Sequence, residues 1–173
     1  MSKTLSVILL ITLVLSSCSV NSKGKSTTAD LSAVDIPKEY GYNFVIFDSD
    51  GDGVKDDIAK LTCLGMSGGY GSFQLEVFTS GEKSYTKIFD SKEYTMDEAT
   101  YQMLHESIDG ELMIDSFYSV EAADTDGDGC EELICRQYAW GESHANHVGE
   151  VVSVFSESNN NIEIIDVRFN ADK

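Results

Sequence analysis

The chain has 173 residues, of which 42% are hydrophobic and 10% aromatic, and 30 acidic residues outnumber 12 lysines and arginines to give a formal net charge of −18. This composition predicts a folded domain of ordinary size rather than a disordered chain. Nucleic acids and anionic membrane surfaces attract basic proteins, so the charge argues against both as partners.

The first eighteen residues have the features of a bacterial export signal. Lys3 precedes a short apolar run over residues 5–15, and two serines then lead to Cys18. The run is too short to span a bilayer, which needs about 20 apolar residues. Residues 15–18 resemble the bacterial lipobox, although an ordinary signal peptide with a chance cysteine is the alternative. The resemblance implies removal of residues 1–17, lipidation of Cys18 and a lipid-anchored protein of the cell envelope, on its periplasmic or its surface side.

Loss of that signal peptide would remove one cation, Lys3, and leave 11 basic against 30 acidic side chains, a net charge of −19. Residues 18–36 are mostly small and polar, which predicts a flexible tether. We expect the folded domain over residues 37–173, starting at Pro37, the only proline in the chain.

Two segments, residues 48–56 and 124–132, share one arrangement of acidic residues. Carboxylates occupy positions 1, 3, 5 and 9 of each segment, and glycines occupy positions 4 and 6. Calcium takes about six to eight oxygen ligands, and glycine at position 6 allows the chain to turn around the ion. With the backbone carbonyl at position 7, the expected calcium ligands are Asp48, Asp50, Asp52, Val54 and Asp56 in one site and Asp124, Asp126, Asp128, Cys130 and Glu132 in the other.

Other interpretations of these segments are weaker. Asp-Gly pairs also form ordinary hairpin turns, but the same spacing occurs twice. An EF-hand needs a glutamate at position 12 and flanking helices, whereas Ala59 and Cys135 stand at that position and the flanking residues predict strands. Magnesium keeps its water ligands and prefers rigid octahedral sites, so calcium is the expected ion.

Between the two segments, Thr95 and Glu98 have the spacing of a capping box, which predicts a helix over about 97–107. After the second segment, His144 and His147 with a nearby acid could bind zinc, although this spacing is more typical of a surface loop. Trp140 could form a ligand platform, but we expect it in the core.

Three cysteines follow Cys18, so at most one disulfide can form among Cys63, Cys130 and Cys135. A bridge between Cys63 and Cys135 would join corresponding strands of the two halves, and the sequence leaves the pairing open. Serine-hydrolase, phosphate-binding and dinucleotide-binding motifs are absent from the sequence, so we predict no catalytic residue.

The likeness between the two segments extends into the residues around them. Tyr42 matches Tyr118 at an offset of 76, and residues 75–78 match residues 152–155 at an offset of 77. Alternating apolar residues and polar turns predict a four-stranded antiparallel meander in each copy. The expected fold is therefore mainly β, with two four-stranded blade-like repeats over about 42–89 and 118–166 and one helical insertion between them.

The two segments resemble the FG-GAP and VCBS-type repeats of bacterial surface proteins and integrin heads. The resemblance is carried by residues 124–129, which are followed by Glu131-Glu132-Leu133-Ile134, and by a looser match over residues 48–58. It implies blade-like sheets whose loop acids hold calcium. A propeller needs at least four blades, so with two copies we expect two packed sheets or an oligomer.

These observations favour a membrane-anchored, calcium-stabilised binding module that faces the periplasm or the exterior and takes a protein or glycan ligand. One alternative is an envelope-associated hydrolase that uses calcium as a scaffold, with a cleft lined by His144, His147, Trp140 and Glu142. A lipoprotein inhibitor or accessory subunit is another alternative.

Overall fold

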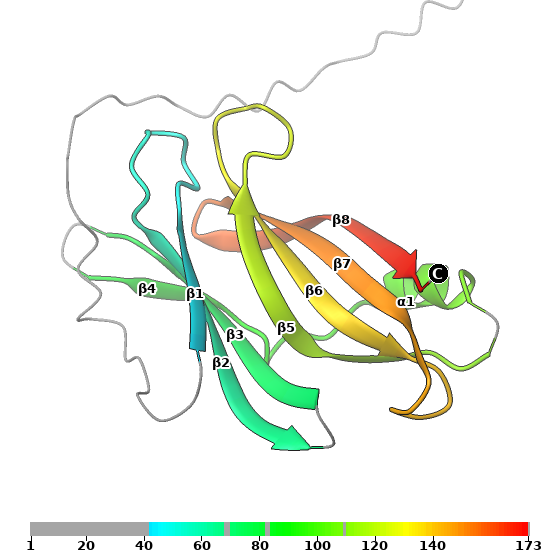
Figure 1. The fold of residues 1–173 in the computed structure, drawn as a ribbon. Coiled ribbons are helices and arrows are strands. Elements are labelled where there is room, and N and C mark those ends of the chain that lie inside the picture. Colours follow the sequence, from blue (N-terminus) through cyan, green and yellow to red (C-terminus); the bar gives the residue numbers. More distant parts are fainter. Residues whose placement is uncertain (1–41, 68–69, 82–83, 109, 173) are drawn as a thin grey trace, which may run out of the picture.

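The computed structural model describes residues 42–67, 70–81, 84–108 and 110–172 (Figure 1). The predicted signal peptide, Cys18, the predicted tether over residues 18–36 and residues 37–41 lie outside the described residues. Within the described residues, no helix is long and apolar enough to span a membrane.

The described chain forms eight strands and one helix. Sheet 1 has the order β1-β2-β3-β4, sheet 2 has the order β5-β6-β7-β8, and all neighbouring strands are antiparallel. The predicted mainly β fold, with two four-stranded meanders and one helix between them, is therefore confirmed. The elements are β1 (Tyr42–Phe47), β2 (Asp57–Ser67), β3 (Tyr70–Thr79), β4 (Thr86–Asp90), α1 (Glu98–His105), β5 (Met113–Ala123), β6 (Glu132–Trp140), β7 (His147–Ser158) and β8 (Asn161–Ala171).

The strands follow the local sequence pattern. In β6, Leu133, Cys135 and Ala139 lie on one face and are buried, as the two-residue period of a strand requires. The β7–β8 hairpin closes through Asn159 and Asn160, whose φ angles are 55° and 62°. Asparagine tolerates this left-handed conformation, so the polar turn predicted between these two strands forms a tight two-residue loop.

The main hydrophobic core lies between the two sheets, so the expectation of two packed sheets is met within one chain. The buried residues of this core are Phe47, Ala59, Leu61, Leu75 and Val77 from sheet 1 and Phe117, Val120, Leu133, Cys135 and Phe155 from sheet 2. A hydrogen bond also joins the sheets directly, because the Phe73 N–H donates to Ser116 Oγ at 3.0 Å.

Helix α1 lies beside β8 and covers the part of sheet 2 that sheet 1 leaves open (Figure 1). Leu104 of α1 packs with Leu112, Ala139 and Val151 in a second core cluster. The predicted helix is confirmed, but its cap is Asp97 rather than Thr95: the Asp97 carboxylate accepts a hydrogen bond from the Thr100 N–H at 3.0 Å. Both residues are good N-caps, and the sequence pattern favoured the one with glutamate three residues later.

Candidate metal centre

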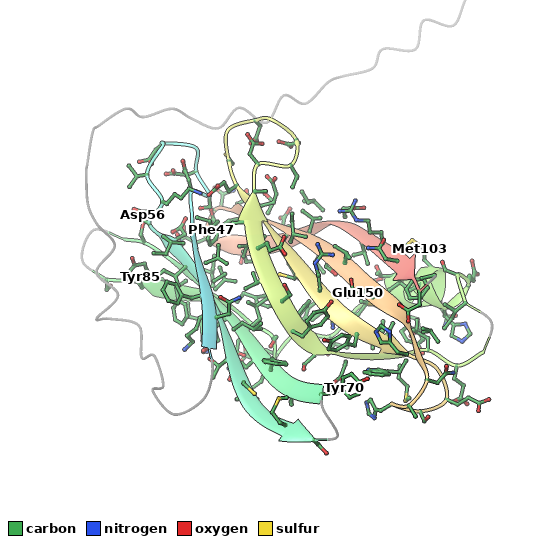
Figure 2. All side chains as sticks on the ribbon, viewed as in Figure 1. Phe47, Asp56, Tyr70, Tyr85, Met103 and Glu150 are labelled. Atoms are coloured by element: carbon green, nitrogen blue, oxygen red, sulfur yellow. The ribbon has the colours of Figure 1, made fainter. Side chains whose placement is uncertain are left out.

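The two acidic segments form loops at the same end of the molecule, where they lie side by side (Figure 1). The first loop comprises residues 48–56 between β1 and β2, and the second loop comprises residues 124–131 between β5 and β6. Figure 2 labels Phe47, the last residue of β1, and Asp56, the last residue of the first loop.

Three carboxylates converge in each loop. Asp48, Asp50 and Asp52 each bring one oxygen to within 4.8 Å of the others, and in the second loop Asp124, Asp126 and Asp128 do the same. Asp48 is buried, whereas the other five acids are exposed. These six residues are predicted ligands at positions 1, 3 and 5, and among the described residues no other group of three or more histidine, cysteine or acidic side chains converges in this way.

The first aspartate of each loop shapes the turn. Asp48 accepts hydrogen bonds from the Gly51 and Gly53 N–H groups, both at 2.8 Å. Asp124 accepts the equivalent bonds at 2.6 and 3.2 Å. Gly53 and its counterpart Gly129 have φ angles of 83° and 94°, so position 6 requires glycine, as expected.

The acids at positions 3 and 5 are oriented by hydrogen bonds to their own loop. One oxygen of Asp50 accepts from the Asp52 N–H at 3.1 Å, and one oxygen of Asp52 accepts from the Val54 N–H at 2.8 Å. Within the described part of the chain, the second oxygen of each of these two carboxylates has no hydrogen-bond donor. In the second loop, one oxygen of Asp126 accepts from the Asp128 N–H at 3.1 Å, and one oxygen of Asp128 accepts from the Cys130 N–H at 2.8 Å.

The acids at position 9 lie outside the two clusters. Phe47 pairs with Asp57 across nine loop residues, whereas Ala123 pairs with Glu132 across eight. The first loop is therefore one residue longer, and Asp57 rather than Asp56 is the structural counterpart of Glu132.

Asp57 and Glu132 have the same role, because each carboxylate accepts hydrogen bonds at the base of its loop. The Glu132 carboxylate accepts hydrogen bonds from the N–H and hydroxyl of Thr125, at 2.8 and 2.7 Å. The Asp57 carboxylate accepts from the Ser49 hydroxyl and, at 2.7 Å, from the Ser80 N–H. The sequence did not reveal Asp57 as the counterpart of Glu132, because the two acidic segments align without a gap when Asp56 is placed opposite Glu132.

Like charges crowd the first loop. Although Asp50 is exposed, partial desolvation of its carboxyl group raises its pKa, and the charges of Asp52, Asp48 and Asp56 raise it further. The hydrogen bond from the Asp52 N–H opposes this increase. Burial also raises the pKa of Asp56, and the charges of Asp57, Asp52 and Asp48 add to the increase, although the Ser80 hydroxyl opposes it. A cation held by these carboxylates would offset this repulsion.

The two loops are joined by Glu131, a residue that sequence reasoning did not single out. Its N–H donates to the Asp48 carbonyl at 2.7 Å, and its carboxylate accepts from the Asp48 N–H at 3.0 Å. The other carboxylate oxygen pairs with Lys55 Nζ at 2.6 Å. Burial raises the pKa of Glu131, but the hydrogen bonds from Lys55 and Asp48 bring it below its ordinary value.

A model of the YybI C-terminal domain matches residues 70–170, which is 101 of the 173 residues. The chain belongs to this family. No curated protein and no solved structure matches the chain. The region that matches the YybI C-terminal domain begins at β3 and includes α1 and the second loop, whereas β1, β2 and the first loop precede it.

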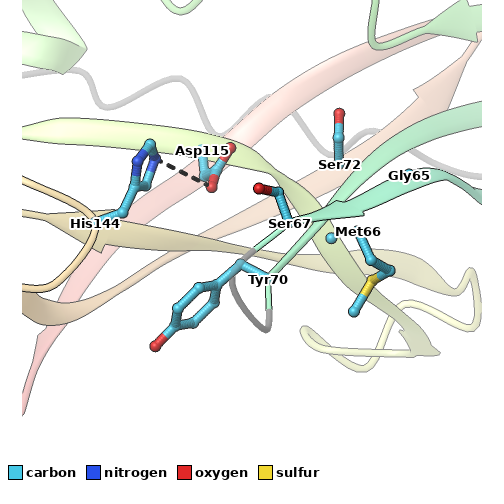
Figure 3. Close-up of a pocket in the computed structure, with 8 residues that line it drawn as sticks. Gly65, Met66, Ser67, Tyr70, Ser72, Asp115 and His144 are labelled. Atoms are coloured by element: carbon cyan, nitrogen blue, oxygen red, sulfur yellow. Dashed lines mark ion pairs between the residues drawn. The ribbon is translucent and has the colours of Figure 1, made fainter.

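At the end of the YybI C-terminal domain that lies opposite the second loop, His144 and His147 have separate carboxylate partners. His144 Nε2 lies 3.8 Å from the Asp115 carboxylate, and His147 Nδ1 lies 2.7 Å from the Asp172 carboxylate. His144 and Asp115 line a pocket of about 630 Å³ with Gly65, Met66, Ser67, Tyr70, Gly71 and Ser72 (Figure 3). Of the four residues expected to line a hydrolase cleft, His144 is the one that lines this pocket.

Trp140 lies in the interior of the YybI C-terminal domain, as expected, with 1% of its surface exposed. Its indole is in edge contact with the rings of Tyr70, His144 and His147. The indole face is therefore covered by neighbouring rings and offers no ligand platform.

Cys63 and Cys135 both carry free thiols, so the bridge considered between them does not form. Cys135 lies fully buried in the core between the sheets. Cys63 is partly exposed, and its Sγ lies 3.5 Å from the Gly65 carbonyl oxygen.

Proposed function

We propose that the protein is a lipid-anchored, calcium-stabilised binding module of the cell envelope, and that each of the two loops holds one calcium ion. One observation carries the calcium proposal: two loops, 76 residues apart in the sequence, bring three carboxylates together with the same hydrogen-bond pattern. Hard oxygen ligands in a flexible loop are the donors that calcium prefers.

The residues present fit this ion. Asp48, Asp50 and Asp52 would hold it in the first loop, and Asp124, Asp126 and Asp128 would hold it in the second. The bound ion would neutralise the clustered charge and fix each loop. Extracellular modules bind calcium at about 10⁻⁴–10⁻³ M, so at millimolar calcium each site would add about 1–2 kcal/mol to the free energy of unfolding.

The resemblance to FG-GAP and VCBS-type repeats supports the same function, because the loop acids of those repeats hold calcium. The lipobox-like residues 15–18 support the anchor, and the net charge of −18 supports a role away from nucleic acid. The ligand of the module would be a protein or a glycan. His144 and His147 support no second function, because each pairs with a different carboxylate.

The calcium proposal is tested by the thermal midpoint of a soluble form that begins at Thr27, measured in EDTA, in millimolar Ca²⁺ and in millimolar Mg²⁺. We expect Ca²⁺ alone to raise the midpoint, and Asp50→Ala and Asp126→Ala each to reduce the increase. Asp166→Ala, which removes an exposed acid on β8, is the control and should keep the full increase. An unchanged midpoint in Ca²⁺ would mean that the loops are ordinary turns.

The anchor is tested by expression of the full chain in a bacterium and separation of membranes from soluble extract. We expect the protein in the membrane fraction and a Cys18→Ser variant in the soluble fraction or as an uncleaved precursor. Mass spectrometry of the membrane form should show acyl chains on an N-terminal cysteine. The same distribution for both forms, without acylation, would remove the anchor from the proposal.

A further inference from the structure

We propose that Glu131 couples the two calcium sites, so that an ion in either loop raises the affinity of the other loop. This inference rests on the proposed function, because it concerns the ions that the two loops would hold. It goes further by making the two loops one binding unit instead of two independent stabilising sites.

On the side of the first loop, Glu131 holds the backbone of the first predicted ligand. The Asp48 carbonyl accepts from the Glu131 N–H at 2.7 Å, and the Asp48 N–H donates to Glu131 Oε2 at 3.0 Å. Asp48 therefore has both of its peptide groups fixed by one residue of the other loop. Its carboxylate in turn accepts hydrogen bonds from the Gly51 and Gly53 N–H groups, and these bonds shape the first loop.

On the side of the second loop, Glu131 directly follows the residue at position 7. The Cys130 N–H donates to Asp128 Oδ1 at 2.8 Å, so the residue that directly precedes Glu131 is hydrogen-bonded to a predicted ligand of the second site. The two loops are in direct contact here. A Cβ atom at Gly51 would lie 3.3 Å from Cys130 Sγ and 3.3 Å from the Gly129 carbonyl oxygen.

The contact between the two loops determines whether an ion in one loop strengthens or weakens binding of an ion in the other. An ion in one loop fixes the backbone near Glu131, so the other loop loses less conformational freedom when its own ion binds. Two cations also repel each other, which acts in the opposite direction. The acids other than Asp48 are exposed, and salt screens exposed charges over about 8 Å at physiological ionic strength, so we expect the ordering effect to exceed the repulsion.

The test measures the coupling factor by calorimetric titration of the full chain with Ca²⁺ alone. A form with Asp50→Asn and Asp52→Asn retains the second site, and a form with Asp126→Asn and Asp128→Asn retains the first site. Both forms keep Asp48 and its bonds to Glu131. The coupling factor is the overall two-ion association constant of the unmodified chain divided by the product of the two single-site constants.

We expect a factor of at least about 5, within the range that is usual for coupled sites. The same three measurements in a Glu131→Ala background should give a factor near 1. Glu111→Ala removes an equal charge from an exposed position outside both loops and should leave the factor unchanged. Glu131→Gln keeps an acceptor for the Asp48 N–H, so it should retain most of the coupling. It also replaces the alanine variant in the measurement if the alanine variant does not fold.

The outcomes separate the two proposals. If the unmodified chain binds no Ca²⁺ at millimolar concentration, the proposed function fails. If it binds two ions with a factor of 1 or less, the calcium sites remain and the coupling is wrong. If the factor is large but unchanged by Glu131→Ala, the coupling does not run through Glu131. A purely structural role for Glu131 would weaken both sites equally and leave the factor unchanged.

Discussion

The ring of Tyr70 lies edge-on against the indole of Trp140, with their centroids 4.4 Å apart and an angle of 84° between the ring planes. Tyr70, which is labelled in Figure 2, begins β3 of sheet 1, and Trp140 ends β6 of sheet 2. The contact therefore joins the sheets at the end opposite to the two acidic loops, so contacts join the two sheets at both ends of their common core.

We expect Tyr70→Ala to lower the free energy of unfolding by about 1–3 kcal/mol, because it removes a ring contact and exposes the indole beneath it. Urea unfolding followed by the fluorescence of Trp140, the only tryptophan, measures the change. Tyr70→Phe keeps the ring and is the control, since no hydrogen bond of the Tyr70 hydroxyl is found among the described residues. Equal losses in both variants would contradict the ring-packing explanation.

Glu76 binds two lysines that differ in burial. Lys60 Nζ lies 2.7 Å from Glu76 and its side chain is 8% exposed, whereas Lys87 Nζ lies 3.4 Å away and is 44% exposed. Lys60→Met should destabilise the fold by about 1–3 kcal/mol, less than a fully broken buried pair, because Lys87 remains near Glu76. Lys87→Met should have a much smaller effect. Thermal unfolding of both variants tests this order, and the reverse order would show that burial does not govern these pairs.

The carboxylate of Asp90 should make the stability of sheet 1 depend on pH. Burial acts to raise the pKa of Asp90, but hydrogen bonds from Lys87, the Lys92 N–H and Gln74 lower it below its ordinary value. A lowered pKa in the folded state means that this stabilisation is present above the unfolded pKa of about 3.9 and is lost as the pH falls through the folded pKa.

We therefore expect Asp90→Asn to cost about 1–3 kcal/mol at pH 7, the usual range for hydrogen bonds to a charged group, and to cost progressively less as the pH falls below about 4. Urea unfolding of both proteins at pH 7, 5 and 3 measures the difference. A cost that stays constant over this range would show that the charge of Asp90 is not what stabilises the fold.

The thiols of Cys63 and Cys135 should differ in reactivity. Burial raises the pKa of the Cys135 thiol, which lies in the core between the sheets, whereas Cys63 is partly exposed. The thiolate is the reactive form, so iodoacetamide at pH 8 should modify Cys63 in the folded protein and Cys135 only after unfolding. Peptide mass spectrometry with and without urea tests this, and equal labelling of both thiols in the folded state would contradict the burial of Cys135.

The sequence predicted the fold because each meander is locally encoded. Alternating apolar residues define the strands, and polar turns such as the one at Asn159 and Asn160 define the hairpins. The helix was predicted with the wrong cap, since threonine and aspartate are both good N-caps and the structure uses Asp97 rather than Thr95. Its end also differs, because α1 ends at His105.

The candidate site was predictable where it depends on spacing and not where it depends on contacts between the loops. Position 6 glycines and the acids at positions 1, 3 and 5 can be read from the sequence. The extra residue of the first loop cannot be predicted from the sequence, because Asp56 and Asp57 are both acidic and either one can be aligned with Glu132. The pairing of Glu131 with Asp48 spans 83 residues, and no local pattern predicts a contact of that length.

That span also has a kinetic consequence. Each sheet is a meander of consecutive strands and can form from neighbouring segments. The hydrogen bonds between Glu131 and Asp48, in contrast, must close a loop of 83 residues. These hydrogen bonds are therefore expected to form after the main folding barrier, when both sheets have already formed. Interactions absent from the transition state change the unfolding rate and leave the folding rate nearly constant. Ions bound at this end of the molecule would then act chiefly by delaying the separation of the two sheets, and so by extending the lifetime of the folded chain.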